Sequence, residues 1–226
     1  MLFVSEIFGS LQGEGPKAGE PAVFLRLAFC NLKCSWCDTK YTWDWSTYDM
    51  AKEVRPMPLE EVEEAIRSYA IKHLVVTGGE PLLQAKRLEP LLRRLEGYYV
   101  EVETNGTVPP PPGLLGLVAQ WNVSPKLGNS GNPFEARLKW PALRCFARLP
   151  NSYFKFVVVE PADLLEVDAL VSELELPPCR VLLMPEGTAP EAIEGRMRWL
   201  KGEAARRGYH LSPRLHILLW GNARAR

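Results

Sequence analysis

Short apolar runs alternate with amphipathic stretches along this chain of 226 residues, and this alternation limits the folds open to it. Short apolar runs are typical of buried strands, and amphipathic stretches are typical of surface helices. Repetition of the two predicts a parallel β-sheet covered by helices. The runs that we interpret as strands are 22–29, 74–77, 98–102, 117–123, 153–159, 180–184 and 215–220.

The stretches between these runs have apolar residues at helical spacing. The stretch 59–70, LEEVEEAIRSYA, follows Pro58 and carries acidic residues in its first turn, which favours a helix start. The connection 107–116, TVPPPPGLLG, is too rich in proline for a regular helix. The other stretches that we expect to be helical are 86–95, 134–147, 163–174 and 189–206.

Polar and glycine-rich residues gather at the carboxyl ends of the apolar runs. GGEP follows Thr77, Glu103 follows the run 98–102, and Ser124 follows the run 117–123. Active sites of barrels and open parallel sheets are built at this edge. About six parallel strands are too few for a closed eight-stranded barrel. We therefore expect an α/β fold, an incomplete (β/α)6-type barrel like a TIM barrel, with mostly parallel strands and its active site at their C-terminal ends.

Composition and charge restrict the partners of the chain. Lys+Arg and Asp+Glu both number 27, and this balance argues against nucleic acid, which usually requires a basic surface. No segment approaches about 18 consecutive apolar residues, so we expect no membrane span. The N-terminal residues lack the pattern of a signal peptide. We expect a cytoplasmic protein, and in that compartment clustered cysteines indicate metal binding or catalysis more often than disulfides.

Three of the five cysteines lie in the segment 30–45, CNLKCSWCDTKYTWDW, at the spacing C-x3-C-x2-C. A structural zinc site would need a fourth Cys or His, and a bacterial ferredoxin run would continue to a further Cys. A [4Fe–4S] cluster held by three thiolates instead leaves one iron open for a small molecule. We expect the other two cysteines, which lie near apolar residues far from this loop, to be buried free thiols: Cys145 and Cys179.

The cysteine spacing after the first apolar run, with an aromatic residue before the last cysteine, resembles the radical S-adenosylmethionine (SAM) superfamily. The segment 75–81, VVTGGEP, resembles the superfamily's GGE motif. The resemblance implies that Cys30, Cys34 and Cys37 hold a [4Fe–4S] cluster whose open iron chelates SAM. It also implies one radical SAM domain over residues 1–226, with its cluster loop at 30–45.

The N-terminal segment 6–43, EIFGSLQGEGPKAGEPAVFLRLAFCNLKCSWCDTKYTW, is similar to the 7-carboxy-7-deazaguanine synthases of queuosine biosynthesis. These radical SAM lyases convert 6-carboxy-5,6,7,8-tetrahydropterin to 7-carboxy-7-deazaguanine with loss of ammonia. The resemblance implies SAM, a [4Fe–4S] cluster and Mg²⁺ as cofactors. It further implies a homodimer and an electron donor such as flavodoxin or ferredoxin.

The same resemblance assigns the site residues, with no side chain acting as general acid or base because SAM supplies the radical. Substrate contacts are expected from Leu11, Gln12, Gly13, Glu14, Arg26 and Thr77. SAM contacts are expected from Gly79, Glu103, Ser124, Pro125 and Lys126. Thr39 is expected to ligate Mg²⁺, which suits a hard, weak ligand because the cation keeps several waters. The neighbouring Asp38 is not assigned to the metal.

Three of these assignments have simpler alternatives, and for Thr39 the alternative is a plain turn hydroxyl. The glycines of LQGEG form either a plain turn or a close approach to a flat ligand. Arg26 lies in an otherwise apolar strand, where an unpaired charge is costly. Its partner is either a structural carboxylate, Glu6 or Glu20, or the substrate carboxylate, which a planar guanidinium can hold through two bonds. We favour the substrate, because this strand leads directly into Cys30.

Two other functions compete with the synthase. A glycyl-radical-enzyme activase shares the cysteine loop and TGGEPLLQ, but it would act on a protein glycine and need neither LQGEG, Arg26 nor Thr39. A metal-binding module that scaffolds a partner would hold one zinc ion and no sulfide. The sequence assigns no role to the basic tail Ala223–Arg226.

Overall fold

The computed structural model describes residues 1–225, and its strands form one sheet in the order β3-β1-β2-β4-β5-β6-β7-β8-β9. Strands β2 and β4 to β9 run parallel to one another, whereas β1 pairs antiparallel with both β2 and β3. In this part of the chain the sheet ends at β3 and β9 without closing, which confirms the predicted incomplete barrel. The strands are β1 (Leu2–Leu11), β2 (Pro21–Leu27), β3 (Arg55–Met57), β4 (His73–Gly78), β5 (Tyr99–Thr104), β6 (Gln120–Val123), β7 (Ser152–Val158), β8 (Val181–Pro185) and β9 (His210–Leu211).

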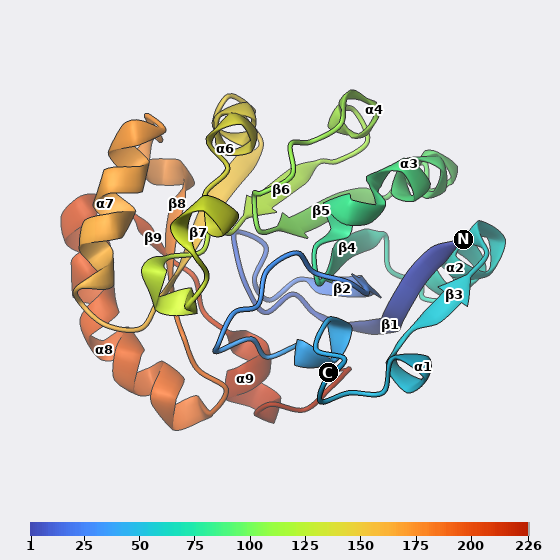
Figure 1. Cartoon of the computed structure of the whole chain (residues 1–226), viewed down its shortest axis with the longest axis horizontal. Coiled ribbons are helices and arrows are strands. Elements are labelled where there is room, and N and C mark those ends of the chain that lie inside the picture. Colours follow the sequence, from blue (N-terminus) through green and yellow to red (C-terminus); the bar gives the residue numbers. More distant parts are fainter. Residues whose placement is uncertain (226) are drawn as a thin grey trace.

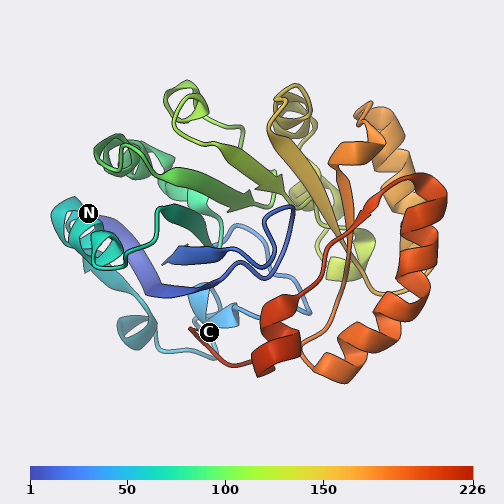
Figure 2. The ribbon, with the colours of Figure 1, turned by 180° about the vertical axis from the view of Figure 1, so that it is seen from behind.

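Most helices lie along the outer side of the curved sheet, while α9 and the C-terminal segment lie across its open side (Figures 1 and 2). The α-helices are α1 (Met50–Glu53), α2 (Leu59–Arg67), α3 (Ala85–Arg94), α4 (Pro112–Leu115), α5 (Phe134–Arg137), α6 (Trp140–Ala147), α7 (Asp163–Glu173), α8 (Pro190–Arg207) and α9 (Leu215–Trp220). Short 3-10 helices are η1 (Lys40–Thr42), η2 (Pro81–Gln84), η3 (Gly128–Ser130) and η4 (Pro178–Arg180). Among residues 1–225, no helix is long and apolar enough to span a membrane.

The main hydrophobic core lies between the sheet and the outer helices. Trp121 of β6 is fully buried and packs edge-to-face on Phe146 of α6, with ring centroids 5.4 Å apart. Burial of one large apolar side chain contributes about 1.5–3 kcal/mol, so this layer holds the strands in place. On the inner side, Phe8 and Phe24 stack at 5.1 Å and belong to a much smaller apolar cluster. The inner side is therefore largely available for polar chemistry.

The prediction of a strand at 215–220 is wrong, because this segment forms helix α9. The segment LHILLW is apolar except for His216, so its periodicity does not separate a strand from a short buried helix. The last strand is instead the two-residue β9, which pairs with β8. The predicted strands also omit β1, whose ten residues mix buried and half-buried positions and form the antiparallel start of the sheet.

The predicted helices are confirmed at α2, α3, α7 and α8, with ends that shift by a few residues. The predicted helix 134–147 breaks after Arg137 into α5 and α6, because Pro141 fits only the first turn of a helix. The proline-rich connection forms only the one-turn helix α4. The expectation of buried thiols at Cys145 and Cys179 is wrong, since both side chains are exposed.

Candidate active site

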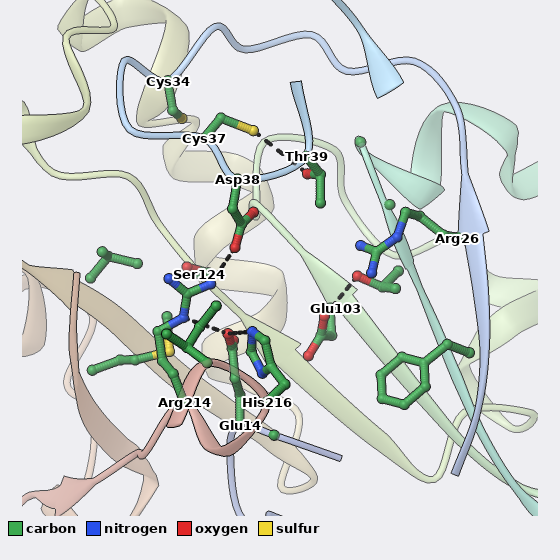
Figure 3. Close-up of a pocket in the computed structure, with 18 of the residues that line it drawn as sticks. Glu14, Arg26, Cys34, Cys37, Asp38, Thr39, Glu103, Ser124, Arg214 and His216 are labelled. Carbon is green, nitrogen blue, oxygen red and sulfur yellow. Dashed lines mark hydrogen bonds and ion pairs between the residues drawn. The ribbon is translucent and has the colours of Figure 1, made fainter. Parts of the chain in front are cut away.

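One pocket at the carboxyl ends of the parallel strands collects the predicted site residues (Figure 3). All of them line it except Pro125, which is buried beside Ser124. Cys34 and Cys37 lie at one end of the pocket, and Arg26 and Glu103 lie on another side of it (Figure 3). Side chains from β1, β2, β4, β5 and the cluster loop therefore converge, although they are distant in the sequence.

The cluster loop begins at a strained residue that is held by aromatic packing. Phe29 follows β2 with φ of 74°, in the left-handed region that residues other than glycine seldom adopt. Its ring packs edge-to-face on Phe3 at 5.3 Å and on Trp45 at 6.0 Å, and its N–H donates to the Thr42 carbonyl. These contacts hold the turn that directs the chain from the strand into Cys30.

The three sulfur atoms of the loop each accept a hydrogen bond from nitrogen. Donors of this kind are known to tune iron–sulfur clusters through the charge on sulfur. The pairs are the Leu32 N–H to Cys30 Sγ at 3.5 Å, Asn132 Nδ2 to Cys34 Sγ at 3.3 Å and Trp43 Nε1 to Cys37 Sγ at 3.4 Å. Burial raises the pKa of the Cys30 thiol to about 12 and also raises the pKa of Cys34. Thiolates in this setting need cations beside them, which the irons of a cluster provide.

The arrangement of these cysteines also bears on the kind of metal centre. Within the part of the chain that the structure describes, no three His, Cys, Asp or Glu side chains converge closely enough to hold one metal ion. A cubane cluster binds each thiolate through a different iron, so its ligands need not meet at one point. The donor set therefore fits a [4Fe–4S] cluster better than the single zinc ion of a scaffold module.

The GGEP segment lets β4 end directly against the start of the cluster loop. A Cβ on Gly78 would overlap the Leu27 backbone, and a Cβ on Gly79 would overlap the Phe29 carbonyl. Glycine is required at both positions for this close approach. The following Glu80 is fully buried and accepts hydrogen bonds from Leu82 N–H at 3.0 Å and Asn105 N–H at 2.7 Å. Glu80 therefore fixes the loops beneath the pocket.

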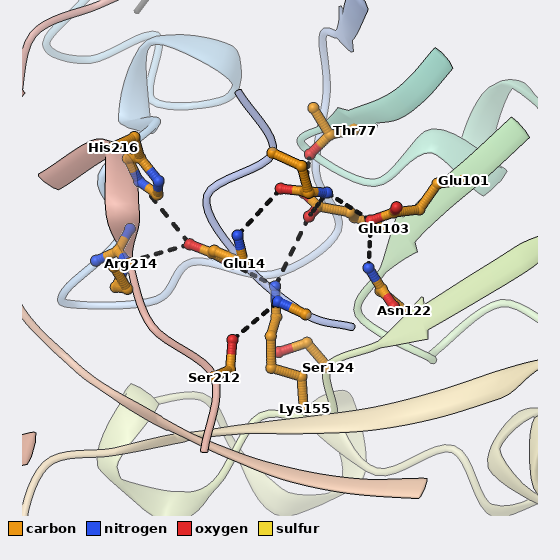
Figure 4. A network of polar contacts seen from close by, with 12 residues as sticks. Glu14, Thr77, Glu101, Glu103, Asn122, Ser124, Lys155, Ser212, Arg214 and His216 are labelled. Atoms are coloured by element: carbon orange, nitrogen blue, oxygen red, sulfur yellow. Dashed lines mark hydrogen bonds and ion pairs between the residues drawn. The ribbon is translucent and has the colours of Figure 1, made fainter. Parts of the chain in front are cut away.

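Glu14 lies between two cations that the sequence motifs do not contain (Figure 4). Its Oε2 accepts a hydrogen bond from Lys155 Nζ of β7, and its Oε1 accepts one from Arg214 Nε at 3.1 Å. Arg214 also donates to Asp38, next to the cluster cysteine Cys37. Although burial raises them, the pKa values of Glu14 and Asp38 are held below their usual range by these cations. The network joins the LQGEG loop, the cluster loop and the end of the sheet.

Gln12 and Glu103 lie beside this network, and their side chains face in different directions. Gln12 is 1% exposed, and its Nε2 donates to the buried Glu101 of β5, so this side chain anchors the loop. Glu103 accepts a hydrogen bond from Thr77 Oγ1 at 2.7 Å and remains partly open to the pocket. A Cβ on Gly13 would overlap the His216 ring, so this glycine is needed for protein packing.

Arg26 has the structural partner that the sequence analysis considered less favoured. Its Nε donates to Glu6 Oε2 at 2.8 Å, whereas its guanidinium still lines the pocket. Both side chains are largely buried, with 17% and 12% of their surface exposed. Glu20, the other carboxylate considered, instead pairs with Lys17 at 2.9 Å.

The charged or polar side chains of the pocket that sequence reasoning missed include Lys155, Arg214 and His216. Lys155 lies within the apolar run YFKFVVV, and a charge in an apolar strand is the signal that singled out Arg26. That signal could have found Lys155. Arg214 and His216 stand in no motif, and only the fold of the last segments brings them to the pocket.

A partial barrel with three pocket-facing cysteines after its first parallel strand defines a radical SAM protein, and residues 25–122 match the family model of the Radical SAM superfamily. The chain is 44% identical to the 7-carboxy-7-deazaguanine synthase of Pyrobaculum aerophilum, across 99% of this chain and 96% of that protein. It is 35% identical to the synthase of Halobacterium salinarum, across 98% of this chain and 91% of that protein. The chain belongs to the 7-carboxy-7-deazaguanine synthase family.

Solved structures agree with this assignment. The crystal structure of QueE from Escherichia coli matches with a TM-score of 0.70 and 30% identity, and the match covers 93% of this chain and 92% of that one. SuiB from Streptococcus suis shares the fold alone, with a TM-score of 0.54 and 11% identity over 85% of this chain and 53% of that one. The full-length relatives favour the synthase over the activase that the cysteine loop also allowed.

Proposed function

We propose that this chain converts 6-carboxy-5,6,7,8-tetrahydropterin to 7-carboxy-7-deazaguanine with loss of ammonia, as a radical SAM lyase. The observation that carries the proposal is the composition of one pocket. Three cysteines lie at one end, and the residues that line the rest include Arg26, Glu14 and Glu103. Such a pocket can hold a cluster and a flat, carboxylated, hydrogen-bonding substrate side by side.

The cluster end is assigned to electron transfer and SAM. Cys30, Cys34 and Cys37 hold a [4Fe–4S] cluster, which with SAM supplies the radical when both are bound. Lys126 donates to the Ser124 carbonyl at 3.0 Å and to its hydroxyl at 2.9 Å, which fixes this segment against the pocket. In this proposal Gly79, Glu103, Ser124, Pro125 and Lys126 form the SAM site.

The opposite end is assigned to the pterin. We assign the edge of the ring to the backbone of Leu11, Gln12 and Gly13. The Gln12 N–H and carbonyl already bond to Glu20 and Gly19, and the Gly13 carbonyl accepts from Leu215, so the carbonyls offer only a second lone pair. Glu14 and Thr77 add polar contacts. Glu14 is already fixed by Lys155 and Arg214, so its position does not depend on the substrate. Arg26 binds the substrate carboxylate.

Mg²⁺ is the third cofactor of the proposal. Thr39 Oγ1 lies 3.6 Å from Cys37 Sγ and faces the pocket, whereas the adjacent Asp38 is paired with Arg214. A lone hydroxyl suits Mg²⁺, which keeps several waters and uses substrate oxygens as further ligands. At this position the cation would stabilise negative charge on the substrate.

The proposal also includes the surroundings expected from the family. The chain acts as a single radical SAM domain, as a homodimer in the cytoplasm, with a one-electron donor such as flavodoxin or ferredoxin. Reduction matters for the assay, because only a reduced cluster can start the radical chemistry, although the conversion of the pterin to the deazaguanine and ammonia is redox-neutral overall.

Anaerobic turnover of the reconstituted protein tests the proposal. The assay contains SAM, dithionite, Mg²⁺ and 6-carboxytetrahydropterin, and its product is analysed by mass and ultraviolet spectrum. We expect 7-carboxy-7-deazaguanine. Formation of 5′-deoxyadenosine without any deazapurine would keep the superfamily assignment and overturn the proposed substrate.

A further inference from the structure

We infer that Glu6 is a positioning residue that fixes the Arg26 guanidinium so that its terminal edge faces the substrate carboxylate. This inference rests on the proposed function, since it deepens the role of Arg26. It concerns a residue outside the pocket lining, on strand β1, that lies behind the arginine.

The geometry begins with the way in which Arg26 is held. Glu6 and Arg26 are register partners on the antiparallel pair β1–β2, and Glu6 Oε2 accepts from Arg26 Nε at 2.8 Å. Among the described residues, neither terminal nitrogen of Arg26 makes a hydrogen bond, and the guanidinium reaches from β2 into the pocket (Figure 3). A carboxylate can therefore bind end-on to the two free nitrogens.

Glu6 is itself fixed by further donors. Tyr41 of the cluster loop donates its hydroxyl to Glu6 Oε2 at 2.9 Å, and Arg224 Nε donates to Glu6 Oε1 at 3.1 Å. Beneath the guanidinium, the Phe8 ring centroid lies 5.7 Å from Arg26 Cζ. With its Nε edge and one face taken, Arg26 keeps one orientation before the substrate arrives, which lowers the cost of binding.

A different role for Glu6 makes the opposite predictions. If Glu6 only balanced the charge of Arg26, it would compete with the substrate carboxylate. Removal of its charge would then tighten binding, and a small shift of its carboxylate would change little. Positioning requires the reverse, because geometry decides the strength of a bidentate pair.

The test measures how far the enzyme prefers 6-carboxypterin to pterin, which lacks the carboxylate. Dissociation constants are determined by fluorescence for the reconstituted enzyme with SAM. Glu6→Asp keeps the charge but withdraws it by one methylene, and we expect it to reduce this preference about tenfold. Glu6→Gln keeps an oxygen that accepts from Arg26 Nε and Tyr41 at the original place and loses only the acceptor for Arg224, and we expect a preference within about threefold of wild type.

The matched control is Glu53→Asp. Glu53 of α1 accepts from Arg224 at 2.8 Å, like Glu6 it is mostly buried, and its partner is the tail alone. We expect this variant to bind both pterins like wild type. An equal loss of preference in Glu53→Asp would mean that the tail, and not the orientation of Arg26, causes the effect.

Other outcomes overturn the inference. The first is a wild-type preference in Glu6→Asp. The second is a Glu6→Gln variant that either loses as much preference as Glu6→Asp or binds 6-carboxypterin more tightly than wild type. The third is an equal weakening of 6-carboxypterin and pterin binding in Glu6→Asp. Arg26→Met should remove the preference. If Arg26→Met retains it while wild type still forms 7-carboxy-7-deazaguanine, the positioning role fails and the proposed reaction stands.

Discussion

The two walls of the pocket are built from different kinds of sequence. The wall formed by β2, β4 and their loops carries two contiguous motifs, the three cysteines and GGEP. Its function as a cluster site can therefore be predicted from short stretches of sequence. The opposite wall, from β7 to α9, provides Lys155, Arg214 and His216 as isolated residues. The cluster takes its three protein ligands from one short loop, whereas the charge network around Glu14 draws single side chains from separate elements.

The largest expected effect comes from breaking the motif-bearing wall. Cys37→Ala removes one cluster ligand, so we expect loss of the iron–sulfur absorption and a fall in turnover of at least about a thousandfold. Absorption spectra and iron and sulfide analysis measure the first, and the anaerobic assay measures the second. Cys145→Ser is the control, because its exposed thiol lies on α6, and should behave like wild type. Normal turnover in Cys37→Ala would contradict the assignment.

A substitution in the opposite wall should weaken turnover of the substrate but leave the cluster in place. Lys155→Met removes the cation that Glu14 and Glu103 share, so Glu14 keeps its hydrogen bond from Arg214 but its second carboxylate oxygen loses its donor. We expect kcat/KM to fall about a hundredfold while the iron–sulfur absorption remains. Lys201→Met removes an exposed lysine of α8 and serves as the control. Loss of the cluster in Lys155→Met would mean that the two walls are not separable.

Acidification tests the charge network around Glu14 through the free energy of unfolding. The pKa values of Glu14 and Asp38 lie below their ordinary 4.5 and 3.8: burial acts to raise them, and the neighbouring cations outweigh it. Carboxyls with lowered pKa values stabilise the fold above their ordinary values, and this contribution is lost as the pH falls through the lowered ones. We expect the free energy of unfolding to drop below about pH 4.5, and Arg214→Met to flatten that drop. Denaturant titrations at several pH values measure the free energy of unfolding. The same dependence on pH in wild type and Arg214→Met would argue against the network.

The smallest effect is expected where the chain closes the pocket. Arg224 pairs with Glu53 and Glu6 but is 45% exposed, and exposed ion pairs contribute about 0–1 kcal/mol. Arg224→Ala should therefore lower the free energy of unfolding by less than about 1 kcal/mol. Thermal and denaturant unfolding measure the change. A loss of several kcal/mol would show that the tail supports the sheet.

Much of the fold was predictable because its signals are local. The alternation of apolar and amphipathic segments predicted the parallel sheet, and helices such as α2 and α3 follow their periodicity closely. The segment 215–220 was misjudged because the periodicity of a short apolar run does not separate a strand from a helix, and the thiol of Cys145 was misjudged for another reason. Burial depends on what packs against a side chain, and an apolar neighbourhood in the sequence does not report it.

The sequence by itself determined the cluster loop, the glycines of GGEP and the family, because ligand spacing and backbone freedom are properties of a few consecutive residues. Tertiary structure decided the partners of the charged residues. Arg26 meets Glu6 through antiparallel pairing of β1 and β2, and Glu14 meets Lys155 and Arg214 across the pocket. Each of these pairs joins separate elements, and the last two span more than a hundred residues of chain. Electrostatic partners are chosen by distance in space, which only the folded sheet defines.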